Sequence, residues 1–297
     1  MPSIRIEANE DCNDVANYLA EGLKNFNDTI NIKCLISNLD NKQAVSITCN
    51  IKESKFRGLL APELHNSMVM TLANILADYI ILKFEKRLVT RIINTNYCYF
   101  SAAERNKILG LAMQEVKSDT TLINGLLQIR KRNTVVQTLQ KYLEESDIVI
   151  LEGFTNFRLK DYIRELEEIV DTAVNNFLME KEYTEFIQLL RYFVETQQSK
   201  CDIVHIVVDH DGTHTLIDSQ KNEITHAHIQ EFSKEPVFEE ITHDDLLISS
   251  LITLAPKQLI VHNVNFFRNK KLLETIKSVF RGKVQICPDC DICTIKV

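Results

Sequence analysis

Apolar residues recur at helical spacing through the middle of this chain, most clearly over residues 155–198. There they return at steps of three and four residues, as on one face of an α-helix. A second set beyond residue 180 keeps the spacing but is out of phase with the first. We therefore expect two helices here, or one helix with a kink near Glu180. The first set is Tyr162, Leu166, Ile169, Ala173 and Phe177, and the second is Phe186, Leu190, Phe193 and Val194.

Further helices are expected upstream of this segment. A long one begins at Ala61-Pro62, where a proline in the first turn loses no hydrogen bond, and runs to about Asn94. Another begins after Ser101, because Ser101 and Glu104 have the spacing of a capping box. A third is expected over residues 120–145. Together these elements predict a helical block over roughly residues 61–198.

Strand patterns lie at both ends of the chain. The N-terminal end predicts one strand, one helix and a hairpin, at residues 4–6, 11–26, 30–36 and 44–51. Near the C-terminus, Asp211-Gly212 separates two apolar runs and predicts a second hairpin. A strand–helix–strand pattern over residues 258–287 predicts a parallel crossover, and residues 244–254 a helix. The chain is therefore expected to be α+β, with a small α+β unit, a central helical bundle and a C-terminal α/β unit with a mixed sheet. The corresponding domains are residues 1–57, 58–200 and 201–297.

Glycine is scarce, and its spacing excludes several catalytic loops. The chain has 7 glycines in 297 residues, and no two are closer than 15 positions. A Walker loop, a dinucleotide-binding loop and a hydrolase nucleophile elbow each need closely spaced glycines for tight backbone turns. None of these motifs can be written from this sequence. The sequence thus holds no complete catalytic motif, which favours a protein that is not an enzyme but leaves the question open.

The N-terminus and the cysteine pattern indicate a reducing cytoplasm. Residues 1–5 lack the apolar run of a signal peptide. The most apolar stretch, Met68–Leu82, is interrupted by Asn74 and Asp78, so we expect no membrane span. Five of the eight cysteines are scattered through apolar segments, unlike a secreted disulfide framework.

Charge is unevenly distributed along the chain. Residues 83–141 carry 11 bases and 4 acids, whereas residues 142–245 carry 8 bases and 24 acids. The densest basic run is Arg130-Lys131-Arg132. It could contact phosphates, but the neighbouring acidic block repels nucleic acid and no recognition motif accompanies it. We therefore favour intramolecular charge pairing, or a charged face that binds a protein partner.

Three cysteines near the C-terminus have the spacing of metal ligands. Cys287, Cys290 and Cys293 form a C-x2-C-x2-C run, whose thiolates can converge on one ion. Zinc would need a fourth ligand, a histidine or cysteine from elsewhere, and an iron–sulfur cluster usually needs a fourth cysteine. A thiol–disulfide pair is a third reading. The remaining one is a reduced tail whose thiols have no joint role.

Histidines and carboxylates offer weaker candidates. Six histidines lie within 39 residues, but none has the spacing of a known metalloenzyme motif. Glu165, Glu167 and Glu168 are read as the solvated face of a helix rather than as an acid–base pair. We therefore assign no catalytic and no cofactor-binding residue. The six histidines are His205, His210, His214, His226, His228 and His243.

Three segments resemble the YtxC-like family of putative sporulation proteins. They start at Leu151-Glu152-Gly153-Phe154, at Lys181-Glu182-Tyr183 and at Asp245-Leu246-Leu247-Ile248, and they extend over about residues 150–263. The resemblance implies a cytoplasmic protein of an endospore-forming bacterium that acts in or near sporulation. It implies no activity, cofactor or catalytic residue.

The leading functional expectation is therefore a sporulation-associated protein that acts through protein–protein contacts. The alternative is a metal-binding protein or metalloenzyme that uses Cys287, Cys290 and Cys293. Neither the partner nor the oligomeric state follows from the sequence.

Overall fold

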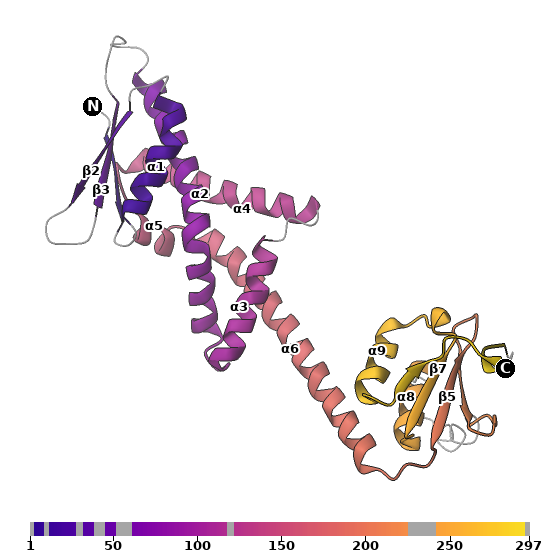
Figure 1. The fold of residues 1–297 in the computed structure, drawn as a ribbon. Coiled ribbons are helices and arrows are strands. Elements are labelled where there is room, and N and C mark those ends of the chain that lie inside the picture. The colour runs from indigo at the N-terminus through magenta and orange to yellow at the C-terminus, as the bar shows by residue number, and fades with distance from the viewer. Residues whose placement is uncertain are drawn as a thin grey trace. The chain divides into compact units, whose positions relative to one another are not determined.

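The computed structural model describes most of the chain (Figure 1). It confirms the α+β class, with helices predominating over two small sheets. The chain divides into two compact units, the N-terminal unit (residues 1–178) and the C-terminal unit (residues 179–297). The sequence predicted three domains instead, with boundaries after residues 57 and 200. The described residues are 3–8, 12–27, 32–38, 45–51, 61–117, 122–224 and 242–294.

The N-terminal unit contains a four-stranded sheet in the order β2-β3-β1-β4. β1 lies beside the strand β3 of the predicted hairpin and pairs with it antiparallel. On its other side β1 pairs parallel with β4. β4 was not expected from the sequence, because it has only three residues. Its pairing with β1 joins the N-terminal strands to the helical segment, so the two expected domains share one unit. The strands are β1 (Ser3–Ala8), β2 (Ile32–Asn38), β3 (Val45–Ile51) and β4 (Ile148–Ile150).

The helices begin close to the expected positions. The capping box at α3 is present: Glu104 Oε2 accepts from the Ser101 N–H at 2.9 Å, and the Glu104 N–H donates to Ser101 Oγ at 3.3 Å. The helices that begin before residue 179 are α1 (Cys12–Asn27), α2 (Ala61–Asn96), α3 (Ala102–Lys117), α4 (Leu122–Glu145), α5 (Leu151–Phe157) and α6 (Lys160–Thr196).

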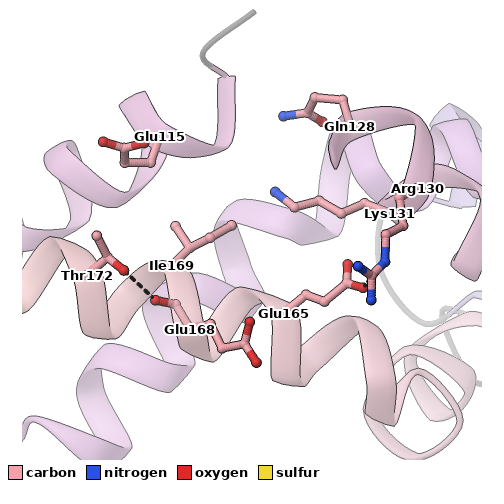
Figure 2. Close-up of a pocket in the computed structure, with 8 residues that line it drawn as sticks. All are labelled: Glu115, Gln128, Arg130, Lys131, Glu165, Glu168, Ile169 and Thr172. Atoms are coloured by element: carbon pink, nitrogen blue, oxygen red, sulfur yellow. Dashed lines mark hydrogen bonds and ion pairs between the residues drawn. The ribbon is translucent and has the colours of Figure 1, made fainter. Parts of the chain in front are cut away.

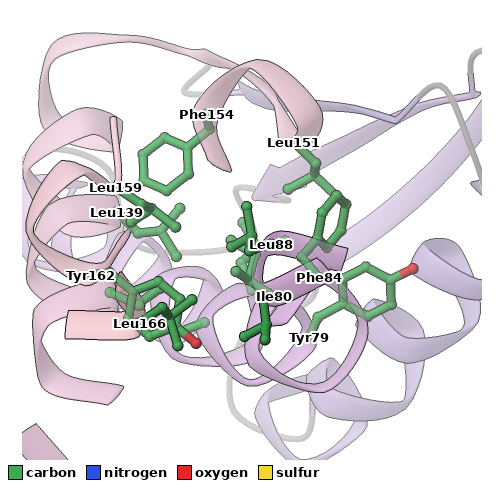
Figure 3. Close-up of a cluster of buried hydrophobic side chains, with 14 of the residues drawn as sticks. Tyr79, Ile80, Phe84, Leu88, Leu139, Leu151, Phe154, Leu159, Tyr162 and Leu166 are labelled. Atoms are coloured by element: carbon green, nitrogen blue, oxygen red, sulfur yellow. The ribbon is translucent and has the colours of Figure 1, made fainter. Parts of the chain in front are cut away.

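The core of the N-terminal unit is built around α2 (Figure 3). Ile4 and Ile6 of β1 are fully buried, and so is Ile80 of α2. Side chains from α4, α5 and α6 complete the cluster, among them Leu139 and Phe154.

α2 spans Ala61–Asn96, close to the helix that the sequence predicted from Ala61 to about Asn94. Its segment His65–Asn96 has the length and composition of a membrane span, which Asn74 and Asp78 were expected to prevent. Half of the most apolar window is buried against protein. The apolar residues of α2 thus serve the core of the N-terminal unit, the ordinary role of a central helix.

α6 is one helix, which resolves the two out-of-phase patterns of residues 155–198. The first set faces the core of the N-terminal unit, where Tyr162, Leu166 and Phe177 are buried. Of the second set, Val194 is buried in the core of the C-terminal unit and Leu190 packs against that core, whereas Phe186 and Phe193 are exposed. The other buried position of this part of α6 is Ile187, which the pattern did not include. The phase shifts because each part of the helix meets a different core.

The C-terminal unit has a mixed four-stranded sheet. Its mixed character was predicted from the sequence, and the structure adds the strand order β6-β5-β7-β8. β5 and β6 form the expected hairpin, and Gly212 in its turn has a φ of +88°, which glycine adopts readily. β5, β7 and β8 are parallel, with α8 and α9 as crossover helices. These elements are β5 (Ile203–Val208), β6 (His214–Asp218), α8 (His243–Leu254), β7 (Gln258–His262), α9 (Lys270–Val279) and β8 (Val284–Ile286).

One polar contact lies inside the N-terminal core. The hydroxyl of Tyr162, which is 1% exposed, donates to Glu85 Oε1 at 2.7 Å. Burial and the nearby Glu85 carboxylate raise the pKa of Tyr162, so the phenol keeps the proton that it donates. The hydrogen bond therefore compensates part of the cost of burying the carboxylate.

Removing this donor should destabilise the N-terminal unit. We expect Tyr162→Phe to lower the free energy of unfolding by about 1–3 kcal/mol, because the buried Glu85 carboxylate loses one hydrogen-bond donor. Urea unfolding followed by circular dichroism measures the change. Tyr99→Phe is the matched control, since Tyr99 is 70% exposed. Equal effects of the two substitutions would contradict the prediction.

Candidate metal centre

The parallel pairing of β7 and β8 brings together two candidate metal ligands. One of them, Cys287, was predicted from the sequence, and the other, His262, was not. Leu259, Ile260 and Val261 pair with residues 284–286, so both strands end at the same edge of the sheet. His262 is the last residue of β7, and Cys287 directly follows β8. The Cys287 N–H donates to the carbonyl of Val261 at 2.9 Å, which continues the ladder to the cysteine.

The other two cysteines return to this edge in a short turn. Cys293 lies in the 3₁₀ helix η2 (Asp291–Thr294), and its N–H donates to the carbonyl of Cys290 at 2.9 Å. The side-chain amide of Asn263 donates to the carbonyl of Cys293 at 3.2 Å. The turn is therefore stabilised by one hydrogen bond within itself and by one to Asn263, the residue that follows β7.

Three thiols and one imidazole converge as a result. The ligand atoms of Cys287, Cys290, Cys293 and His262 all lie within 4.8 Å of one another, and we call these residues the Cys3His cluster. His262 Nδ1 lies 3.4 Å from both Cys290 Sγ and Cys293 Sγ. Cys293 Sγ lies 3.9 Å from Cys290 Sγ and 3.8 Å from Cys287 Sγ.

These distances are close to the edges of a zinc-centred tetrahedron. Bonds of about 2.3 Å to sulfur and about 2.0–2.1 Å to nitrogen give edges of about 3.8 Å between sulfurs and about 3.5 Å between sulfur and nitrogen. A disulfide would need sulfurs about 2.05 Å apart. An iron–sulfur cluster spreads its ligands over several irons. The arrangement therefore suits a single tetrahedral ion best.

A second histidine holds the imidazole of His262 in place. His205, on the neighbouring strand β5, has its Nδ1 2.9 Å from His262 Nε2. If His262 presents Nδ1 to a metal, its Nε2–H donates to His205, as second-shell partners of ligating histidines accept. Burial lowers the pKa of both imidazoles, which favours the neutral forms that this arrangement requires.

The thiols by themselves resist ionising together. Burial, and hydrogen bonds that the protonated Cys287 thiol makes to Cys290 and Cys293, raise the pKa of Cys287 to about 12. Burial also opposes ionisation of Cys290, but hydrogen bonds from the Cys293 and Ile292 backbone and from both other thiols outweigh it and lower its pKa. A divalent cation removes this conflict, because it replaces the protons of all three thiols.

Comparison with known proteins identifies the family. A profile of the YtxC-like family matches residues 70–285. The chain belongs to the YtxC-like family. It is 27% identical over 202 residues to "Uncharacterized protein YtxC" of Bacillus subtilis (strain 168), a match that covers 66% of this chain and 69% of the relative. No solved structure matches the chain.

The YtxC-like match ends two residues before Cys287. It therefore includes His205 and His262 but none of the three cysteines. The arrangement of the Cys3His cluster is thus an observation about this chain, and the family match adds nothing to it.

The remaining sequence candidates do not join this cluster. His214 lies 3.5 Å from Asp244, and His210 contacts the ring of Phe266. His243 begins α8, whereas His226 and His228 lie outside the described residues. Of the three glutamates expected on a solvated face of α6, Glu168 is exposed, whereas Glu165 and Glu167 are half-buried.

The sequence missed His262, and it listed His205 only among the weaker histidine candidates. Both lie in apolar strands outside any ligand spacing, and His262 is 25 residues from Cys287. The available signal was that His262 ends one parallel strand and Cys287 follows the next, so their carboxyl ends share an edge.

Proposed function

We propose that the C-terminal unit binds one zinc ion through Cys287, Cys290, Cys293 and His262. The observation that carries the proposal is the convergence of these four ligand atoms at tetrahedral distances. Four protein ligands leave no open position for water or substrate, so the ion has a structural role rather than a catalytic one. It fastens the turn after β8 to the end of β7.

Zinc content tests this proposal directly. Full-length protein purified anaerobically, in the presence of reductant and zinc, should contain one zinc ion per chain by elemental analysis. Chelation should lower the melting temperature by roughly 10 °C, since a ligand at 100 times its Kd stabilises by about 2.7 kcal/mol. Protein that holds no zinc after reconstitution would refute the proposal, whether or not it holds iron.

Substitution of single ligands separates this site from adventitious binding. Cys290→Ser and Cys293→Ser should lose most of the bound zinc, because serine is a poor ligand for this ion. Cys98→Ser, an exposed cysteine of the N-terminal unit, should keep it. Full zinc content in all three variants would place the metal elsewhere.

His205 should tune the affinity without being a ligand. His205→Phe removes the acceptor for His262 Nε2–H and should weaken zinc binding by about 10–100-fold, as loss of second-shell partners does. His205→Gln, whose side-chain oxygen can accept that proton, should restore part of the affinity. Competition with a chromophoric chelator measures both constants, and His210→Phe, exposed on the adjacent turn, is the control. Equal affinities of His205→Phe and the control would remove His205 from the site.

We further propose that the protein is associated with sporulation, acts in the cytoplasm and contacts a protein partner. Family membership supports the first part, and free cysteines support a reducing compartment. For the third, Met179, Phe186 and Phe193 are exposed at seven-residue steps on α6, with Leu189 beside them. A partner helix packs against side chains spaced in this way.

Deletion of the gene tests these last points together. A strain that lacks the protein should form fewer heat-resistant spores, and the wild-type gene should restore them. Phe186→Ser with Leu189→Ser changes only exposed positions, so a folded double variant should fail to restore spores if a partner binds there. Spore formation at wild-type frequency and timing in the deletion strain would contradict the association.

A further inference from the structure

A cavity of about 280 Å³ lies within the N-terminal unit (Figure 2). Side chains of α3, α4 and α6 line it. Its volume is near the lower end of the range of small-molecule sites, about 300–1,000 Å³. The cavity thus has the size for a molecule of a few carbon atoms.

Lys131 is the buried cation of this cavity. It is only 6% exposed, although it lies in the central basic run. Figure 2 shows its amine directed into the cavity. Within the described part of the chain this amine has no hydrogen bond and no ion pair, and Glu85 and Glu165 act on it only through space. Native proteins rarely leave a buried polar group in this state.

The other charged groups of the cavity do not favour a charged ligand. Arg130 Nε lies 3.5 Å from Glu165 Oε1, so these two side chains compensate each other. Glu115 has an interaction of its own, and Glu168 is exposed to solvent. An anion would meet three carboxylates here, and a cation would meet Arg130 and Lys131. The charge around the cavity therefore suits an uncharged ligand.

The uncharged polar groups of the cavity are also engaged. The side-chain amide of Gln128 donates to the carbonyl of Val116, and the hydroxyl of Thr172 donates to the carbonyl of Glu168 at 2.9 Å. Ile169 contributes an apolar surface. Of the buried polar groups that line the described cavity, the Lys131 amine is thus the one that is available for a new bond.

A buried lysine amine can form a covalent bond with an aldehyde. Burial lowers the pKa of Lys131, which favours the neutral amine that acts as a nucleophile. The amine nitrogen attacks the carbonyl carbon and forms a C–N bond, and the carbonyl oxygen leaves as water. In total, the ammonium form of the lysine and one aldehyde give one protonated imine and one water molecule. No oxidant or reductant is needed.

The protonated imine keeps the positive charge of Lys131. This matters because Glu85 is only 7% exposed and, together with Glu165, it acts on that charge. Acylation of the amine would remove the charge and leave the buried carboxylate without it, which is costly. An aldehyde is therefore a better reaction partner for this site than an acyl donor.

We propose that Lys131 forms a reversible imine with a small uncharged aldehyde that enters this cavity. The carbon chain of the aldehyde rests against Ile169, and the ion pair of Arg130 with Glu165 stays in place. This site is independent of the proposed zinc ion, which belongs to the C-terminal unit.

Reductive trapping in the zinc-loaded, full-length protein tests the proposal. Propanal with cyanoborohydride converts each imine into a stable propylamine, and mass spectrometry of peptides gives the labelling rate of each lysine. Lys131 should be labelled at least about tenfold faster than Lys141, because desolvation favours its neutral amine. Lys141 is an exposed lysine of the same helix that does not line the cavity. Equal rates, or slower labelling of Lys131, would overturn the proposal.

Glyoxylate, a small anionic aldehyde, tests the charge selectivity of the cavity. The carboxylates of Glu115, Glu165 and Glu168 should repel it. The ratio of the Lys131 rate to the Lys141 rate should therefore fall at least about tenfold from its value with propanal. The same ratio with both aldehydes would contradict the selection of an uncharged ligand.

A substitution in the cavity wall connects the reaction to this site. Thr172→Trp at an exposed position of α6 narrows the cavity and should slow the labelling of Lys131 at least about tenfold, because the aldehyde loses its space. Thr196→Trp, an exposed threonine of the same helix outside the cavity, should leave it unchanged. Thr172→Leu is the milder variant if Thr172→Trp does not fold. Unchanged labelling of Lys131 in the folded cavity variant would overturn the proposal, whereas Cys290→Ser should be labelled normally even if it loses zinc.

Discussion

The helix α6 must satisfy two hydrophobic cores with a single backbone geometry, and both units depend on how it does so. Its turns fix apolar side chains at steps of three and four residues. Tyr162 and Leu166 face one core, and Ile187 and Val194 face the other. The apolar face of α6 changes its phase near residue 180. This position coincides with the division of the chain into two units.

Much of the architecture could be predicted because it rests on local rules. The capping box at Ser101, the turn at Gly212 and the apolar periods of the long helices are each encoded within a few residues. β4 could not be foreseen, since a three-residue strand has no period and exists through its pairing with β1. The same long-range pairing explains why the N-terminal strands and the helices form one unit.

The residues of the candidate site likewise fall into those that local sequence predicts and those that depend on long-range pairing. The three cysteines were evident from their spacing, whereas His262 and His205 depend on which strands become neighbours. The spacing of residues along the sequence can reveal ligands that lie in one segment of the chain. Ligands from other segments can be identified only when the order of strands in the sheet is known. The burial of Lys131 was equally hidden, because a run of three basic residues reads as surface until the packing of α4 is known.

The buried polar groups of the N-terminal unit also limit how its helices can be aligned. Tyr162, Glu85 and Lys131 lie on α6, α2 and α4, and their charges and hydrogen bond match only in the observed register. Sliding one helix by a turn, about 5.4 Å, would break these contacts and leave a charge in the interior without them. These three residues therefore favour one axial alignment of the three helices.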